Sequence, residues 1–255
     1  MCTAVIEVPE SPDAAVRLLA VRDEDPGRAW DAPGRWWPDR PGLIGVRDRL
    51  AGGAWLAADP AERRLSLVLN RAETSPLGLP QGPSPAGSRG VLVLDEASGR
   101  TIPDPPGTAN FNLVGLSRTG ARVTSWDGTG YHRTDLEPGM HMIAHHDVDD
   151  AVRTPRIAHW LPAFREVAGL PDAEWREQWI GVLDESTRLA VDDDRAIIRD
   201  NRRHGYATLS LLVCLAELRP GATGDEGADG SLSIDTAVLA EPAHWQRPAF
   251  ERISA

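Results

Sequence analysis

Residues 15–24 read Ala15-Val16-Arg17-Leu18-Leu19-Ala20-Val21-Arg22-Asp23-Glu24, an apolar run that closes on three charged side chains. Upstream, residues 3–8 alternate and are rich in β-branched side chains, so both segments are predicted to be β-strands. If the two strands pair in an antiparallel manner, the charged end of the second strand lies beside Cys2 at the start of the first. The pairing would place an arginine and carboxylates next to a thiol.

Short apolar segments bounded by glycine, proline or charged residues continue along the chain. They predict strands at residues 42–46, 54–58, 65–70, 110–116, 121–126 and 140–145. Residues 91–96 fit either a strand or a helical turn, because so short an apolar run has no decisive period. Residues 30–41 are rich in arginine, tryptophan and proline, and residues 74–90 are rich in proline, glycine and serine. Both are expected to form loops, the second of them mobile.

Helical periodicity is confined to later segments, where apolar residues recur at three- and four-residue spacings over 155–167 and 172–184. Residues 206–218 and 231–239 are predicted to form a closing hairpin, joined by the acidic loop 224–230. We find no internal repeat and no break in composition. We therefore expect one α+β domain over residues 1–255, with strands first and helices mostly late.

Composition excludes several classes of function. The 255 residues include 27 basic and 38 acidic side chains, and 27 minus 38 gives a net charge of −11, which disfavours nonspecific binding to nucleic acid. All basic residues are arginines, so Schiff-base and lysine-nucleophile chemistry is excluded. The amino-terminal residues lack the basic start and apolar block of a signal peptide, and no run of about 18 apolar residues predicts a membrane span. We therefore expect a cytoplasmic protein.

Cysteine usage makes Cys2 the most informative position. Cys2 and Cys214 are too few for a disulfide framework, and Cys214 lies in an apolar run typical of a small buried hydrophobe. If Met1 is removed, Cys2 carries both a thiol and an α-amine, whose pKa of roughly 7.7–8.0 suits a base near neutral pH. Arg22 would favour the thiolate, and Asp23 would hold the amine by a charge-assisted hydrogen bond. The alternative for Cys2 is a cysteine without a functional role. The alternative for residues 22–24 is a solvated turn.

Several motifs occur in order along the chain. They are Met1-Cys2-Thr3, Leu18-Leu19-Ala20-Val21-Arg22-Asp23-Glu24, Gly52-Gly53-Ala54-Trp55-Leu56, Leu67-Val68-Leu69-Asn70-Arg71, Ser88-Arg89-Gly90 and Asn110-Phe111-Asn112-Leu113. In this pattern the sequence resembles the NRDE family, also called the transport and Golgi organisation protein 2 family. That family in turn resembles cysteine N-terminal nucleophile hydrolases.

The resemblance implies a fold and a set of site residues. The fold would be an αββα sandwich of the N-terminal nucleophile hydrolase type. Cys2 would be the nucleophile, Arg22 and Asp23 would support it, and Asn70 would donate to the oxyanion. Asn112 would be a second polar contact to the substrate, and the resemblance implies that Asn112 and His145 bind substrate. No metal ion or other cofactor is implied.

Three positions depart from the family pattern. Val21 stands where the motif that names the family has asparagine, Ala207 where arginine is expected, and His145 where asparagine is expected. Either the substrate has changed or catalysis has been lost. The first hypothesis is an amidohydrolase that cleaves a carbon–nitrogen bond in a small molecule. The second is a non-catalytic carrier of the same fold, since roles in lipid or haem handling have been proposed for the family. The oligomeric state is left open.

Two further clusters are candidate binding sites. His141, His145, His146 and Asp147 invite a metal interpretation, but the chain has neither an HExxH motif nor a cysteine pair, which favours a polar pocket or surface. The second cluster comprises Arg35, Trp36, Trp37 and Arg40. It would either stack on a flat ligand or pack as a rim loop.

Overall fold

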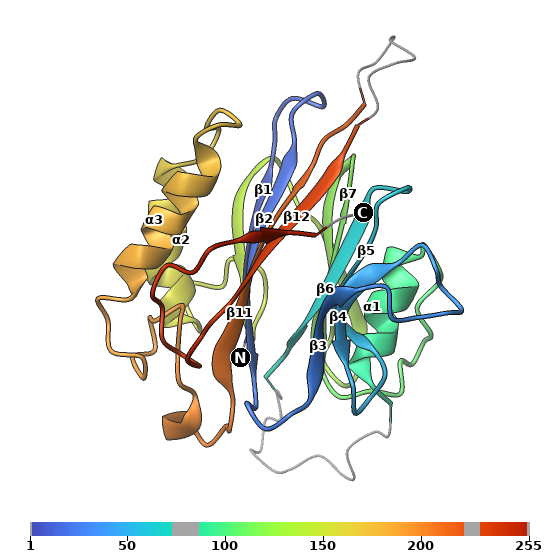
Figure 1. Cartoon of the computed structure of the whole chain (residues 1–255), viewed down its shortest axis with the longest axis horizontal. Coiled ribbons are helices and arrows are strands. Elements are labelled where there is room, and N and C mark those ends of the chain that lie inside the picture. The colour runs from blue at the N-terminus through green and yellow to red at the C-terminus, as the bar shows by residue number, and fades with distance from the viewer. Residues whose placement is uncertain (1, 73–86, 222–229, 254–255) are drawn as a thin grey trace.

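The computed structural model describes residues 2–72, 87–221 and 230–253, and within them the chain folds as two antiparallel sheets with few helices (Figure 1). The expected α+β class is confirmed. The first sheet has the strand order β10-β1-β2-β11-β12-β13. These strands are β10 (Gly139–Ile143), β1 (Thr3–Val8), β2 (Val16–Glu24), β11 (Leu209–Leu218), β12 (Leu232–Val238) and β13 (Glu251–Arg252).

The central pair of the first sheet has the predicted antiparallel register. Thr3 lies opposite Val21, so Cys2 comes opposite Arg22 at the charged end of β2. Because side chains alternate along a strand, Arg22 turns toward the second sheet, whereas Val21 and Asp23 turn to the opposite face. The register therefore gives the thiol and the guanidinium the same face of the sheet.

The second sheet follows the chain more simply, in the order β3-β4-β5-β6-β7-β8-β9. Its strands are β3 (Trp30–Gly34), β4 (Ile44–Asp48), β5 (Ala54–Asp59), β6 (Arg64–Asn70), β7 (Phe111–Ser117), β8 (Gly120–Trp126) and β9 (Tyr131–Asp135). The helices are α1 (Arg89–Ala97), α2 (Pro155–Glu166) and α3 (Trp175–Ser186), with a 3₁₀ turn at Arg202–His204.

Three apolar clusters hold these layers together. One lies between the sheets and includes Ile6 and Leu67, a second lies between the first sheet and α2 and α3, and a third lies between the second sheet and α1. Figure 1 shows α2 and α3 on the outer side of the first sheet and α1 on the outer side of the second. The helices thus cover the faces that the sheets do not bury against each other.

The ambiguous segment 91–96 is helical. Leu92, Val93 and Leu94 are buried against the second sheet, and the Ser88 side chain caps the helix by accepting a hydrogen bond from the Gly90 N–H at 3.2 Å. Gly90 is required where α1 meets β5, because a Cβ there would lie 2.8 Å from the Ala54 nitrogen. The cap and this close approach decided what the apolar run alone did not.

Two elements differ from the sequence expectations. Residues 30–41, expected to be a loop, contain the edge strand β3, which pairs irregularly with β4. Strand β9 was not predicted, because its residues are polar and mostly exposed and show no apolar alternation. The expected loops at 74–90 and 224–230 lie largely outside the described residues. Within the described chain, no helix has the length and apolar character needed to cross a membrane.

Replacing Trp179 by alanine should lower the free energy of unfolding by about 3–5 kcal/mol, because its fully buried indole packs between α3 and the first sheet. Urea denaturation followed by circular dichroism measures the loss. Val152→Ala, at a side chain that is 96% exposed, is the control and should change stability by less than about 0.5 kcal/mol. A loss at Trp179 no larger than that of the control would contradict this packing.

Candidate functional site

Cys2 lies at the start of β1 and is only 7% exposed. Its sulfur donates to the Asp23 carbonyl oxygen at 3.6 Å and accepts from the Asp23 N–H at 3.4 Å. Burial raises the pKa of the Cys2 thiol and the Asp23 carboxylate raises it further, while Arg22 acts in the opposite direction. The thiol is therefore held in place by the backbone of β2 and is kept protonated in this environment.

Arg22 is the cation that faces this thiol. It is 2% exposed, its Nη2 lies 3.4 Å from Glu24 Oε2, and its guanidinium carbon lies 5.2 Å from the centre of the Trp30 ring. Its Nε and Nη1 have no hydrogen-bond partner among the described residues. Burial lowers the pKa of Arg22, but an arginine stays charged at neutral pH. The site therefore holds a buried cation with two donors to spare.

Asp23 is anchored from a distant part of the chain. Its Oδ1 accepts from Ser210 Oγ at 2.6 Å, and its Oδ2 accepts from Asn201 Nδ2 at 3.1 Å. Asn201 Nδ2 also donates to the Thr208 carbonyl oxygen at 3.1 Å, which ties it to the segment that enters β11. A register shift between Ser210 and Leu212 accompanies this arrangement. The carboxylate is consequently fixed in orientation.

The thiol opens onto a cavity of about 480 Å³ at the end of the sheets. Cys2, Arg22, Asp23 and Asn70 all line it, together with Arg89 at the start of α1. Arg89 Nη1 donates to the Asn110 carbonyl oxygen at 3.0 Å, and no ion-pair partner for Arg89 is found in the described ranges. The structure thus brings together the four residues predicted to be catalytic.

Gly53 and Gly90, which belong to two of the sequence motifs, shape this cavity. A Cβ at Gly53 would lie 2.5 Å from the carbonyl carbon of Gly90, so β5 and the start of α1 can touch only where both residues lack side chains. This close approach sets Ser88 and Arg89 at the cavity wall. A purely structural constraint therefore accounts for part of the motif pattern.

Asn112 and His145 are not among the described residues that line the Cys2 cavity. Asn112 is buried, and its Nδ2 donates to the carbonyl oxygens of Ala144 at 3.2 Å and His146 at 2.6 Å. Ser125 Oγ donates to Asn112 Oδ1 at 2.7 Å. The arrangement makes Asn112 a support for the segment after β10, which carries His145.

The histidine cluster does not assemble a metal site. His141 Nδ1 lies 2.8 Å from Asp149, and Asp147 forms an ion pair with Arg71 at 2.7 Å. In the described part of the chain, no three histidine, cysteine or carboxylate side chains gather so that they could hold a metal ion. These side chains instead fasten the loop that follows β10.

The tryptophan pair packs against the rim of the second sheet. Trp37 is buried and its Nε1 donates to the Gly52 carbonyl oxygen at 2.8 Å. Trp36 Nε1 donates to the Ala32 carbonyl oxygen at 3.0 Å, and Arg47 stacks on the Trp36 ring at 4.8 Å. Of the two interpretations left open for these residues, the packed rim loop agrees with the contacts.

Sequence reasoning missed Ser210 and Asn201, whose side chains donate hydrogen bonds to the Asp23 carboxylate. They lie 187 and 178 residues from Asp23 along the chain, so no local spacing connects them to it. It also missed Arg89 as a member of the site, although the Ser88-Arg89-Gly90 motif was a signal for it. Long-range strand pairing was needed to find the first two.

The family model described as Transport and Golgi organisation 2 matches residues 1–201, which include every lining residue of the Cys2 cavity named above. No curated protein matches the chain.

The free energy of unfolding should decrease as the pH falls from about 6.5 toward 3, because His145 resists protonation in the folded protein. Burial and the neighbouring His146 and Arg156 lower the pKa of His145 to about 3. Between that value and about 6.5 the unfolded chain binds a proton that the folded chain does not, so the free energy of unfolding decreases with falling pH.

Urea denaturation of the parent protein and of His145→Gln at pH values between about 4 and 7 measures this contribution. The variant should lose less stability across the window than the parent. Equal losses would show that His145 titrates alike in the folded and unfolded states.

Proposed function

The chain belongs to the Transport and Golgi organisation 2 family, and from this premise we propose that it is an N-terminal nucleophile hydrolase that cleaves an amide bond in a small molecule. The observation that carries the proposal is the convergence of Cys2, Arg22 and Asn70 on one cavity. The two sheets with outer helices would then correspond to the αββα sandwich of such hydrolases. The reaction would take place in the cytoplasm.

Catalysis would begin once removal of Met1 leaves the α-amine on Cys2. The thiol proton moves to this amine as the sulfur attacks the amide carbonyl carbon and its π electrons move onto oxygen. Collapse of the tetrahedral adduct breaks the carbon–nitrogen bond, and the protonated α-amine returns the proton to the leaving nitrogen. Water then hydrolyses the thioester and restores the Cys2 thiol.

The raised pKa of the thiol keeps the proton on sulfur before attack. The sequence predicts that Arg22 favours the thiolate form of Cys2. In the structure, burial raises the pKa of the thiol by more than the charge of Arg22 lowers it. The nucleophile is therefore neutral until the amine accepts its proton during attack.

Two groups at the cavity wall would stabilise the oxyanion. Asn70 ends β6 at the cavity wall, and Arg22 offers Nε and Nη1, neither of which has a partner in the described chain. Donors with no competing partner are available when negative charge develops on the carbonyl oxygen. Asp23, held by Ser210 and Asn201, would orient the α-amine rather than contact the substrate.

Of the departures from the family pattern, Val21 leaves this mechanism intact. It is fully buried in the cluster between the first sheet and the helices, on the face opposite Arg22. Ala207 precedes β11 and is exposed, so an arginine is missing from the segment that leads to Ser210. This loss points to an altered substrate rather than to a missing nucleophile.

The first test is the intact mass of the purified protein combined with alkylation by iodoacetamide. We expect a mass lower by one methionine residue and labelling of Cys2 alone, because Cys214 is fully buried. N-acyl p-nitroanilides with different acyl groups should then release p-nitroaniline. Asn70→Ala should lower kcat by about 10²–10³ while leaving the Cys2 labelling unchanged.

Cys2→Ala should abolish release, and Cys214→Ala is the matched control that keeps it. Retention of Met1 would remove the base and overturn the hydrolase proposal in favour of the carrier of the same fold. A processed protein whose Cys2→Ala variant is as active as the parent would also refute it.

A further inference from the structure

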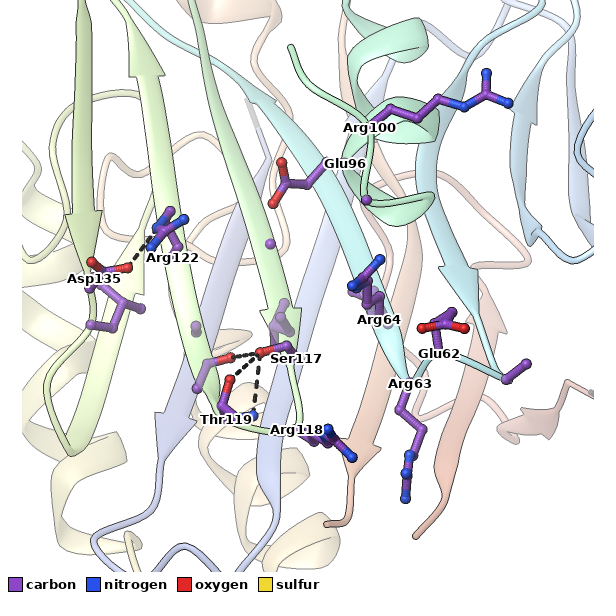
Figure 2. A pocket seen from close by; sticks show the side chains of 18 residues that line it. Glu62, Arg63, Arg64, Glu96, Arg100, Ser117, Arg118, Thr119, Arg122 and Asp135 are labelled. Carbon is purple, nitrogen blue, oxygen red and sulfur yellow. Dashed lines mark hydrogen bonds and ion pairs between the residues drawn. The ribbon is translucent and has the colours of Figure 1, made fainter. Parts of the chain in front are cut away.

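A second and larger cavity lies at the other end of the second sheet. Its volume is about 760 Å³. Its lining includes Arg64 at the start of β6, whereas the lining of the Cys2 cavity includes Asn70 at the end of the same strand. The β7–β8 turn and the end of α1 complete its wall (Figure 2). The two cavities share no described lining residue, so the second one is separate from the proposed hydrolase site.

Arginines dominate this cavity although the chain has a net charge of −11. The lining arginines are Arg63, Arg64, Arg100, Arg118 and Arg122. Only Arg122 has a carboxylate partner in the described ranges, Asp135 at 2.6 Å. Figure 2 shows Arg118 and Arg63 at the two neighbouring turns and Arg64 between these turns and Glu96, while Arg100 extends away past α1.

Many guanidinium groups outside this cavity are matched by carboxylates in the described chain. Arg28 contacts Asp48 at 2.6 Å, Arg40 contacts Asp95 at 2.8 Å and Arg17 contacts Glu7 at 3.1 Å. Arg64 and Arg118 have neither an ion pair nor a side-chain hydrogen bond within the described chain. Two guanidinium groups at one concave site therefore have their donors available for an external anion.

The floor of the cavity is built from the outer face of the second sheet. Gly115 on β7 lies opposite Ser66 on β6 and Arg122 on β8, so these three residues form a row across the sheet. A Cβ at Gly115 would lie 2.4 Å from Glu96 Oε1, which shows that the carboxylate of α1 rests directly over the glycine. Burial raises the pKa of Glu96, and no hydrogen bond to its side chain is found among the described residues.

We propose that this cavity binds a small organic phosphate carrying at least two anionic groups, held by Arg64 and Arg118. A phosphate offers three acceptor oxygens, enough for the forked donors of two arginines. Glu96 excludes anionic groups from the floor and accepts a hydrogen bond from a ligand hydroxyl. The volume suits a small molecule, and the overall negative charge disfavours a nucleic acid or an anionic membrane surface.

Isothermal titration with fructose bisphosphate at about 0.1 M salt tests the proposal, with fructose as the uncharged control ligand. We expect the bisphosphate to bind and fructose not to bind. The Arg64→Gln/Arg118→Gln double variant should weaken binding at least about tenfold. Arg188→Gln, which removes an exposed arginine that follows α3 and lies outside the cavity, is the control and should bind like the parent.

Failure of the parent to bind, or equal binding by the double variant, would overturn the proposal. If the double variant does not fold, Arg118→Glu serves instead, because Arg118 is exposed at a turn and lacks a partner in the described chain. Cys2→Ala should bind the bisphosphate like the parent, which separates this site from the proposed hydrolase.

Glu96→Gln tests the floor of the site. Removing this carboxylate should tighten the binding of inorganic pyrophosphate several-fold, because an anion without hydroxyl groups gains nothing from Glu96 and is repelled by it. Unchanged pyrophosphate binding would contradict the placement of the ligand beside Glu96.

Discussion

The antiparallel pairing of β1 with β2 is the constraint on which the site depends. It sets Cys2 opposite Arg22, and because β2 also pairs with β11, the same strand carries Asp23 to Ser210. A slip of one residue would move every side chain to the other face of the sheet and separate the thiol from the guanidinium. Buried apolar clusters on both faces of this sheet hold the register against such a slip.

At the Cys2 cavity, burial and the attraction between Cys2 and Arg22 shift the pKa values of these two groups in opposite directions. Desolvation raises the pKa of the thiol and lowers that of Arg22, so each group is pushed toward its neutral form. Their mutual attraction acts in the other direction, and the guanidinium stays charged because its ordinary pKa is so high. The outcome is a neutral thiol beside a fixed cation, which would suit the proposed reaction, in which negative charge appears only after attack.

The second sheet separates two chemically different ends. At one end, Asn70 and the start of α1 border the Cys2 cavity, and at the other, Arg64 and Glu96 border the arginine-lined cavity. Glycines allow the close contacts at both ends, Gly53 with Gly90 in the first and Gly115 with Glu96 in the second. Helix α1 thus spans the outer face and contributes to both cavities.

The sequence by itself determined most strands, the two late helices and the position of Cys2 next to Arg22, because these follow from local apolar period and one hairpin. Tertiary structure decided the rest. It made residues 91–96 helical through packing on β5, placed Asn112 and His145 away from the Cys2 cavity, and brought Ser210 to Asp23 from 187 residues away. Such contacts depend on which distant strands become neighbours, and no local pattern in the chain encodes that choice.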